Sequence, residues 1–398
     1  MSDPRPDRPA PPAADLTAAP VPPGTRPAAC WLPSAVEGYR DMLAAAAKAV
    51  AEIRFEFYIF KAGGPGDRFR DAFVAAARRG VKVRVLLDGF GSGDLPASYW
   101  DGLRAAGGEA ATFNPGPLLR LPIRNHHKLL VVDGAVAFVS GFNIGPEYAG
   151  DGVTGGWRDL GLALSGPLVR PLAAAFDAMW DNRNLRRHRE MRQLAARWRH
   201  HRRQPADPQV MAMGPALGRN AFQRLLLSSV HEAREIRIIA AYFLPSRRLR
   251  RALRARARRG CRVRLILPGR TDVAMVLAAS RTYYAGLLRA GIEIAEYQPQ
   301  ILHTKLAIID DAVFVGSSNL DARSLSVNYE LMVRIPSPCL AAEGRELFEA
   351  DWARSRPIEL AAWRRQRTWL DRIAGLVARF GLTRIDPWFA RRRLRSLA

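Results

Sequence analysis

Cysteine is scarce in this chain of 398 residues, which contains only Cys30, Cys261 and Cys339, far apart in the sequence. So sparse a set excludes a disulfide framework and indicates a reducing compartment. It also offers no zinc-ligand pattern, and no H-E-x-x-H sequence is present. We therefore expect neither a metal site nor another cofactor.

Long apolar runs are also missing. The most apolar stretch, residues 129–144, is interrupted by Asp133 and Gly134, so no run has the length needed to cross a bilayer. The first 30 residues are rich in Pro and Ala, and no hydrophobic segment follows their first arginines. We expect them to form a disordered tail, not a signal peptide.

Acidic residues are few relative to basic ones. The chain has 37 Asp+Glu against 61 Lys+Arg, and its net charge is +24. This excess favours anionic partners, which include nucleic acid, an anionic membrane surface or a phosphorylated substrate, although a generally basic proteome would also contribute. Apolar residues make up 48% of the chain, which is typical of a globular protein, and its length suits two domains with tails.

The chain contains an internal duplication. The segment RRGVKVRVLL, which includes Gly80, returns as RRGCRVRLIL around Gly260, 180 residues later. In both copies a helix-like stretch precedes the glycine and a β-branched run follows it. This alternation predicts an α/β fold in which helices cover mixed sheets. The predicted strands are 53–60, 81–88, 236–245 and 262–268, and the predicted helices are 34–50, 69–79 and 247–259.

The duplication predicts two domains, residues 31–185 and 209–355, joined by a basic linker at 186–208. A disordered tail at 1–30 and a basic amphipathic tail at 356–398 flank them. The second tail mixes aromatic and aliphatic residues with many arginines, a composition typical of an interfacial amphipathic helix. A terminal helix packed on the second domain would have the same composition, and the sequence leaves both possibilities open.

The strongest signal is a motif of the form H-x-K-x4-D that occurs twice, 177 residues apart. A short turn of small residues and an asparagine follow each copy. The candidate site residues are His126, Lys128, Asp133 and Asn143 in the first copy, and His303, Lys305, Asp310, Ser317 and Asn319 in the second.

The motif suits phosphoryl chemistry. Residues i and i+2 of a strand point to the same face, so His126 and Lys128 share a face, as do His303 and Lys305. Two such strands related by an approximate two-fold axis would bring both pairs around one cavity. The lysines can hold phosphate oxygens, one neutral imidazole can attack phosphorus, and the other can protonate the departing alkoxide.

The carboxylates of the site have two expected roles. Asp133 and Asp310 belong to the catalytic motif, but they end the apolar runs, and we interpret them as structural strand-end groups. A catalytic histidine also benefits from a carboxylate on its other ring nitrogen. The candidates are Asp159, which follows the first histidine by 33 residues, and Glu330, which follows the second by 27.

The paired motifs resemble the phospholipase D superfamily over roughly residues 31–354. Finer segments resemble bacterial cardiolipin synthases within it, and the most specific is NLDARSL around Arg323. The others are RNHHK at 124–128, NIGPEY at 143–148 and YFLP at 242–245. The common long form has two N-terminal transmembrane helices, so this chain is more similar to the shorter, peripheral form. Ser140-Gly141 stands where that family often has paired glycines.

The resemblance implies two α/β/α sandwich domains with the active site at their pseudo-two-fold interface. It implies a phosphatidyltransferase that makes cardiolipin from phosphatidylglycerol and a second phospholipid. His126 would carry the phosphatidyl group and His303 would serve as general acid and base. The implied partners are an anionic phospholipid substrate and the cytoplasmic surface of the bacterial inner membrane, to which the protein would attach peripherally.

Two alternatives to the transferase stay open. A phospholipase D would use water as acceptor, and nothing in the sequence excludes this, because the acceptor pocket lies in loops. A nuclease of the same superfamily would suit the charge of +24. The segment around Arg323 and the lack of a recognised nucleic-acid module argue against nucleic acid as a partner. The sequence does not indicate an oligomeric state.

Overall fold

The computed structural model describes residues 28–115, 123–184, 207–215 and 220–385. The predicted N-terminal tail and the predicted basic linker fall almost entirely outside these ranges. So does the end of the predicted C-terminal tail, from residue 386 onward. The predicted domain boundaries that fall in these segments stay predictions.

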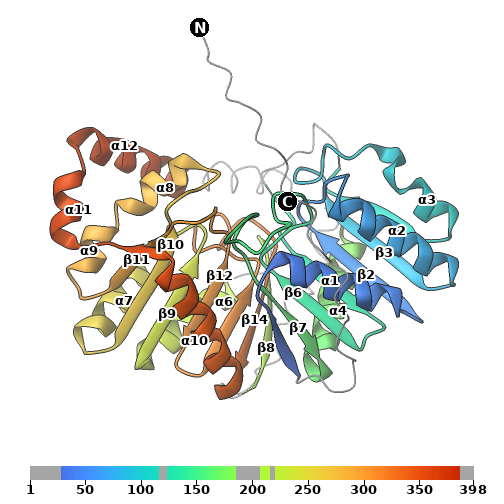
Figure 1. Cartoon of the computed structure of the whole chain (residues 1–398), viewed down its shortest axis with the longest axis horizontal. Helices are drawn as coiled ribbons and strands as arrows, with labels where there is room; N and C mark the ends of the chain where they lie inside the picture. The colour runs from blue at the N-terminus through green and yellow to red at the C-terminus, as the bar shows by residue number, and fades with distance from the viewer. Residues whose placement is uncertain (1–27, 116–122, 185–206, 216–219, 386–398) are drawn as a thin grey trace, which may run out of the picture.

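Two mixed sheets lie side by side and form the body of the molecule (Figure 1). The first sheet has the order β1-β7-β6-β5-β2-β3-β4, and the second has the order β15-β11-β10-β9-β12-β13-β14-β8. The strands of the first sheet are β1 (Ala29–Leu32), β2 (Glu52–Phe57), β3 (Lys82–Asp88), β4 (Glu109–Phe113), β5 (Lys128–Val132), β6 (Val136–Ser140) and β7 (Gly161–Ser165). Those of the second are β8 (Gln209–Met213), β9 (Glu235–Ala240), β10 (Arg262–Pro268), β11 (Glu293–Tyr297), β12 (Lys305–Ile309), β13 (Ala312–Gly316), β14 (Glu330–Pro336) and β15 (Ser355–Pro357).

The two sheets repeat one topology. In the first, β2, β3 and β4 are parallel while β5, β6 and β7 pair antiparallel. In the second, β9, β10 and β11 are parallel while β12, β13 and β14 pair antiparallel. The predicted class, α/β with mixed sheets and an internal duplication, is therefore confirmed.

Short edge strands extend both sheets beyond the predicted repeat. β1 pairs with β7 and β8 pairs with β14, each antiparallel. Within the described residues, regular structure begins at Ala29, two residues before the predicted start at Trp31, because this short segment completes the edge of the sheet. β15 pairs with β11 and places the residues around Ser355 in the second sheet.

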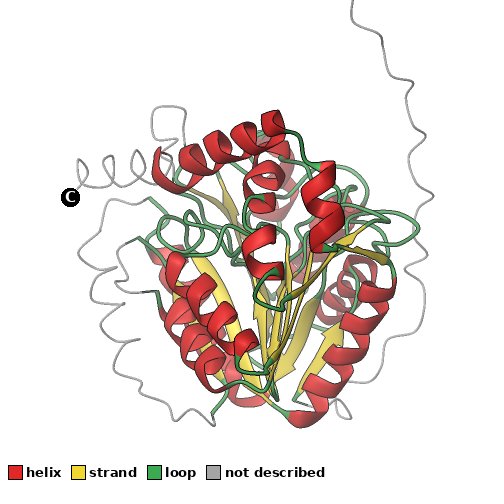
Figure 2. Ribbon diagram, turned by 90° about the vertical axis from the view of Figure 1, so that its left-hand side faces the viewer, coloured by secondary structure: helices red, strands yellow, loops and turns green. Residues whose placement is uncertain are grey.

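Helices cover both sheets (Figure 2). In the first half these are α1 (Ala35–Ala47), α2 (Pro65–Arg78), α3 (Asp101–Ala105) and α4 (Val169–Asp181). In the second half they are α6 (Ala221–Glu232), α7 (Arg247–Arg258), α8 (Ala274–Arg281), α9 (Tyr284–Leu288), α10 (Pro338–Ala353), α11 (Leu360–Gln366) and α12 (Trp369–Phe380). Three 3-10 or π turns complete the described elements at Ala97–Trp100, Gly166–Leu168 and Gly381–Ile385.

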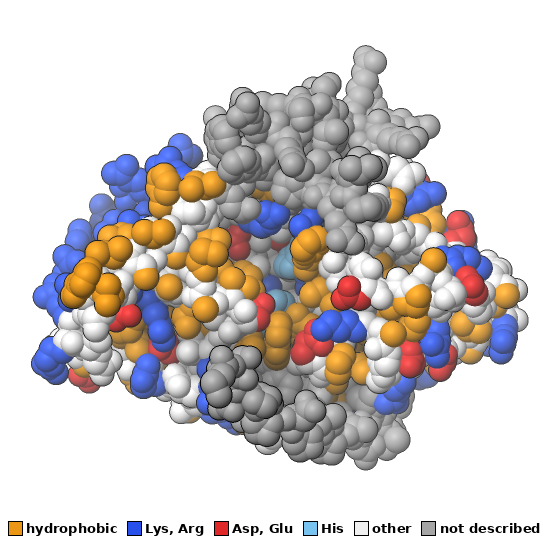
Figure 3. Space-filling view, turned by 90° about the horizontal axis from the view of Figure 1, so that it is seen from above, with side chains coloured by type: hydrophobic (Ala, Val, Ile, Leu, Met, Phe, Trp, Pro, Cys, Tyr) orange, Lys and Arg blue, Asp and Glu red, His pale blue; other side chains and the backbone are white. Residues whose placement is uncertain are grey.

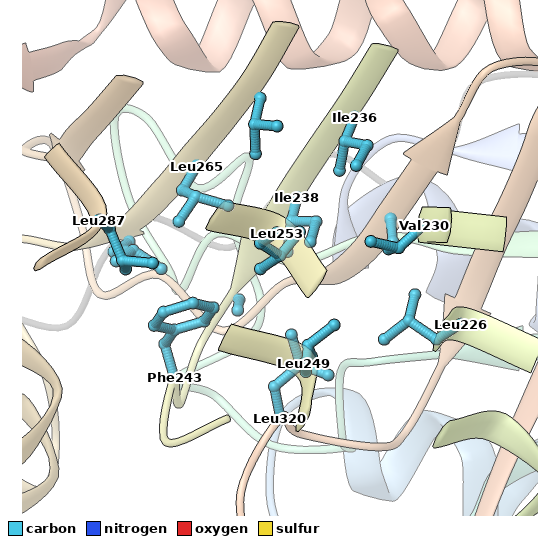
Figure 4. Close-up of a cluster of buried hydrophobic side chains, with 14 of the residues drawn as sticks. Leu226, Val230, Ile236, Ile238, Phe243, Leu249, Leu253, Leu265, Leu287 and Leu320 are labelled. Atoms are coloured by element: carbon cyan, nitrogen blue, oxygen red, sulfur yellow. The ribbon is translucent and has the colours of Figure 1, made fainter. Parts of the chain in front are cut away.

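Strand alternation distributes the apolar side chains between separate cores. Along β9, Ile236 and Ile238 point into the outer core of the second half, whereas Ile239 points into a core that contains residues of both halves. Figure 4 shows the outer core, where Leu226 and Val230 of α6 and Leu249 and Leu253 of α7 meet the strand residues. Their i, i+4 spacing places each pair on one helix face. The shared core fixes the two halves against each other.

The predicted amphipathic C-terminal segment begins with two helices on the second half. Trp363 of α11 is buried and lies 4.9 Å from the ring of Tyr284, and α12 packs along α8. The packed terminal helix is therefore present over the described part of this segment. No helix among the described residues has the length and apolarity to cross a membrane.

Candidate active site

Both motif histidines lie where the two halves meet, and each is hydrogen-bonded to a carboxylate of the other half. His126 Nδ1 is 2.9 Å from Glu330 Oε2, and His303 Nδ1 is 2.6 Å from Asp159 Oδ2. The two predicted carboxylates are thus in the site, but the pairing is crossed. Each carboxylate thus serves the histidine of the other half and not the histidine that it follows in the sequence.

Backbone pairing between the halves explains the crossing. His126 N donates to the carbonyl oxygen of Tyr329 at 2.9 Å, and His303 N donates to that of Arg158 at 2.8 Å. Tyr329 and Arg158 directly precede the two carboxylates in the sequence. Each histidine segment therefore forms a parallel β-bridge with the segment that supplies its carboxylate.

The two motif lysines are buried in the same site. Lys128 is 0% exposed and Lys305 is 4% exposed. Burial, followed by repulsion from Lys305, lowers the pKa of Lys128 to about 7, and burial lowers the pKa of Lys305 to about 8. Two buried ammonium groups, of which one repels the other, favour an anion in the same site.

The imidazoles are held in the neutral form. Burial, followed by repulsion from Lys128, keeps the pKa of His126 well below its ordinary value. Burial and Lys305 lower the pKa of His303 to about 4. When Nδ1–H of His126 donates to Glu330, the neutral ring presents its Nε2 lone pair, as a nucleophile requires. His303 Nδ1 lies 2.6 Å from Asp159 Oδ2 and 2.7 Å from Lys305 Nζ, so both groups orient this ring.

The Glu330 carboxylate accepts a second hydrogen bond, from a side chain of its own half. Burial raises the pKa of this carboxyl to about 7, and Ser317 Oγ donates to its Oε2 at 2.5 Å. Ser317 also accepts from Leu331 N at 3.0 Å. Ser317, predicted as a supporting residue, therefore positions the Glu330 carboxylate that is hydrogen-bonded to His126.

The two motif asparagines differ in their contacts. Asn143 Oδ1 accepts from Ile59 N at 3.1 Å and its Nδ2 donates to Tyr148 Oη at 2.8 Å, so its amide supports the backbone. Asn319 is buried, and its Oδ1 has no hydrogen-bond partner among the described residues.

Asp133 and Asp310, the last residues of the two motifs, lie apart from the motif histidines and lysines. Each lies at the far end of its strand, about 16 Å along the chain from the motif lysine. Asp133 accepts from the backbone N–H groups of residues 50–52 at 2.7–3.0 Å, and Asp310 accepts from those of residues 234 and 235. Both adopt left-handed φ values, 53° and 48°, which aspartate tolerates in turns. This agrees with their interpretation as strand-end groups.

Aromatic rings that the motif did not indicate surround the histidines. Tyr58 lies 4.8 Å from the ring of His126, and Tyr148 and Trp157 lie 5.4 and 5.6 Å from that of His303. Tyr58 directly follows β2, Tyr148 lies five residues after Asn143, and Trp157 lies two residues before Asp159. This closeness in sequence to predicted site residues was the available signal for the latter two. They limit the positions that each imidazole can take.

A buried polar cluster lies beside His126. Glu56 is hydrogen-bonded to Asn125 Nδ2 at 2.6 Å and to His127 Nδ1 at 3.2 Å. The equivalent positions beside His303 are occupied by Ile239, Leu302 and Thr304. His127 faces this cluster, in line with its omission from the predicted catalytic set. The sequence signal for this cluster was the carboxylate of Glu56 inside a predicted strand.

Figure 3 shows histidine side chains at the base of a hollow on the face seen from above. Lysine or arginine side chains gather at its rim. Among the described residues, no group of three or more His, Cys, Asp or Glu side chains could hold a metal ion.

Comparisons with known proteins converge on one family. Residues 42–191 and 226–352 match the family model described as "Cardiolipin synthase, PLD-like domain". A cardiolipin synthase of Alkalihalophilus pseudofirmus is 35% identical over 305 residues, covering 74% of this chain and 60% of the relative. A cardiolipin synthase A of Pseudomonas aeruginosa strain LESB58 is 33% identical over 361 residues, covering 85% of this chain and 70% of the relative.

A solved structure shows the same fold. The phosphatidylserine synthase of Haemophilus influenzae Rd KW20 matches 91% of this chain and 94% of its own, with a TM-score of 0.66 and 14% identity. At this identity the likeness concerns the fold alone.

Proposed function

Because this chain belongs to the phospholipase D-like family described as "Cardiolipin synthase, PLD-like domain", we propose that it is a phosphatidyltransferase that makes cardiolipin. The donor is phosphatidylglycerol and the acceptor is a second phospholipid. The supporting observation is the pair of buried imidazoles, each hydrogen-bonded to a carboxylate of the other half, beside two buried lysines.

In the first step, His126 Nε2 attacks phosphorus and the bond to the glycerol oxygen breaks. Lys128 and Lys305 stabilise the negative charge on the phosphoryl oxygens. His303, protonated when the anionic substrate raises its pKa, gives its proton to the departing glycerol. The phosphatidyl group is left on His126, and glycerol leaves as a neutral alcohol.

In the second step, neutral His303 takes the proton from the hydroxyl of the second lipid. The oxygen of that hydroxyl attacks phosphorus, and the phosphorus–nitrogen bond to His126 breaks. If the second lipid is phosphatidylglycerol, the product is cardiolipin. The assignment of His126 as nucleophile follows the resemblance, since the paired geometry is compatible with either order.

The site of action is part of the same proposal. The net charge of +24 favours peripheral attachment to anionic lipid, at the cytoplasmic side of the bacterial inner membrane. The matched region spans 60% and 64% of the length of the first two relatives.

The test is incubation of the purified protein with phosphatidylglycerol vesicles and identification of the products by lipid mass spectrometry. Cardiolipin supports the transferase, phosphatidic acid alone indicates a hydrolase, and no change contradicts both. An alkaline quench, followed by peptide mapping, locates the adduct. Label on the peptide containing His303 and not His126 would reverse the assignment of nucleophile.

A further inference from the structure

Helix α12 packs with its small residues inward. Gly375 and Ala378 are buried against α8, and a methyl group at Gly375 would come within 2.8 Å of the carbonyl oxygen of Ala278. Arg379 donates to Thr282 Oγ1 at 3.2 Å and helps to hold the helix in place. The helix is therefore anchored by close backbone approach, without burial of its large side chains.

The large apolar side chains of α12 point away from the protein. Six of the ten large apolar side chains that the described residues leave exposed lie on this helix. They follow one another at helical spacing and form a continuous face, which we call the α12 ridge. Its residues are Trp369, Leu370, Ile373, Leu376, Val377 and Phe380, with exposed fractions of 67, 59, 51, 47, 67 and 60%.

The α12 ridge lies on the face of the molecule into which the active site opens. Figure 1 places α12 and α8 at the top left, and Figure 3, seen from above, shows apolar side chains gathered over these helices beside the hollow with the histidines. Phe90, 52% exposed, follows the end of β3 in the first half, and its ring is covered by Arg124, two residues before His126. Apolar side chains thus lie on both sides of the hollow.

The charges around the α12 ridge favour one kind of occupant. Arg364 and Arg365 of α11 and Arg372 of α12 are exposed beside it. A second copy of this chain would bring another net charge of +24 to the contact, whereas anionic lipid headgroups would neutralise these arginines. An apolar helix face bordered by arginine is typical of helices that lie in a membrane interface.

We propose that the α12 ridge inserts among the headgroups of an anionic bilayer and orients the hollow of the active site toward the lipid surface. This rests on the proposed function, because it takes the substrate to be a lipid of that bilayer. Attachment then has an apolar component, which salt does not screen, in addition to the electrostatic one.

The test uses the full chain with Ile373→Gln and Val377→Gln combined. The matched control is Val50→Gln, which removes an apolar side chain that is 81% exposed beside the strand end held by Asp133. Co-sedimentation with phosphatidylglycerol vesicles is measured at low and high salt. Turnover is measured on vesicles and on monomeric dihexanoyl phosphatidylglycerol.

We expect the double variant to lose at least tenfold in vesicle binding at high salt and a similar factor in vesicle turnover. Its turnover on the monomeric lipid should match that of wild type, and Val50→Gln should behave as wild type throughout. Unchanged vesicle binding, or an equal loss on monomeric lipid, would overturn the proposal. So would conversion of a dimer to a monomer by the double substitution in the absence of lipid, because the α12 ridge would then be a contact between copies. Wild type that binds vesicles through the α12 ridge but does not turn over either lipid would contradict the proposed function alone.

Discussion

Replacing Lys128 by methionine should make the protein more stable and much less active. Methionine keeps most of the length and volume of the side chain but removes the charge. The Lys128 ammonium is fully buried and faces the charge of Lys305. In the absence of substrate, this charge opposes folding, whereas in the reaction it stabilises the phosphoryl oxygens.

The size of the stability change follows from the pKa. A lowering of the Lys128 pKa from 10.5 to about 7 corresponds to about 5 kcal/mol, at roughly 1.4 kcal/mol per pKa unit. The variant also loses the hydrogen bond from Lys128 Nζ to His126 O, at 3.0 Å, which contributes about 1 kcal/mol. We expect a net gain of about 3 to 4 kcal/mol in the free energy of unfolding at pH 7. Because the folded-state pKa lies below the unfolded-state one, the gain should be largest below pH 7 and shrink as the pH rises toward 10.5.

Urea denaturation across this pH range measures the gain, and turnover should fall by roughly 10²–10³-fold, as for other preorganised donors. The control is Lys82→Met, at an exposed position at the start of β3, which should leave both quantities near those of wild type. A Lys128→Met variant that was less stable than wild type, or that retained normal turnover, would refute the two-lysine site.

Four further outcomes follow from the site. The pKa of Lys128 is lowered to about 7 and that of Lys305 to about 8, so both lysines lose protons as the pH rises. The KM for monomeric phosphatidylglycerol should therefore increase above pH 8. A constant KM up to pH 10 would contradict this. Glu330→Gln should slow formation of the histidine adduct by at least about 10²-fold, measured in a single turnover, whereas Asp159→Asn should have its larger effect with poor leaving groups. Asp133→Ala should lower the free energy of unfolding by about 1–3 kcal/mol while turnover per folded molecule stays constant, because three backbone N–H groups lose their acceptor. Excess chelator should leave turnover within about twofold, and full loss restored by one divalent ion would contradict the metal-free reaction.

The sequence predicted the repeated parts of the fold well. The predicted strands at 81–88 and 262–268 correspond to β3 (Lys82–Asp88) and β10 (Arg262–Pro268), because their β-branched runs and preceding glycines are local signals. The edge strands β1 and β15 have four and three residues and no such signal. They form because a neighbouring strand offers unpaired backbone groups, which is a property of the assembled sheet.

The site was predictable in its members but not in its pairing. Two copies of a motif with constant spacing identify His126 and His303, but spacing does not reveal which half supplies each carboxylate. The bridges at Tyr329 and Arg158 decide that, and they form only when the halves meet. The cluster around Glu56 was missed because it is absent from the second copy, and the repeat was the main guide.

On α12, the residues that are buried differ from those that a helical pattern predicts. Composition predicted either an interfacial amphipathic helix or a terminal helix packed on the second domain, and the described part of the segment shows the packing. The small residues Gly375 and Ala378 pack on the protein, while the larger residues stay exposed. A helical-wheel argument that assigns the large apolar side to the core fails here, because close backbone approach holds the helix instead.

The crossed pairing of histidines and carboxylates also bears on how such a chain could have arisen. Each half donates one carboxylate and receives one, so the contact is reciprocal, as in a two-fold symmetric dimer. An ancestor with one copy of the repeat would have had an unsupported histidine as a monomer, and a complete pair of sites only when two molecules associated. Fusion of two copies would then have freed them to diverge, and the cluster around Glu56, present in one half alone, is a difference that a dimer of identical chains cannot have.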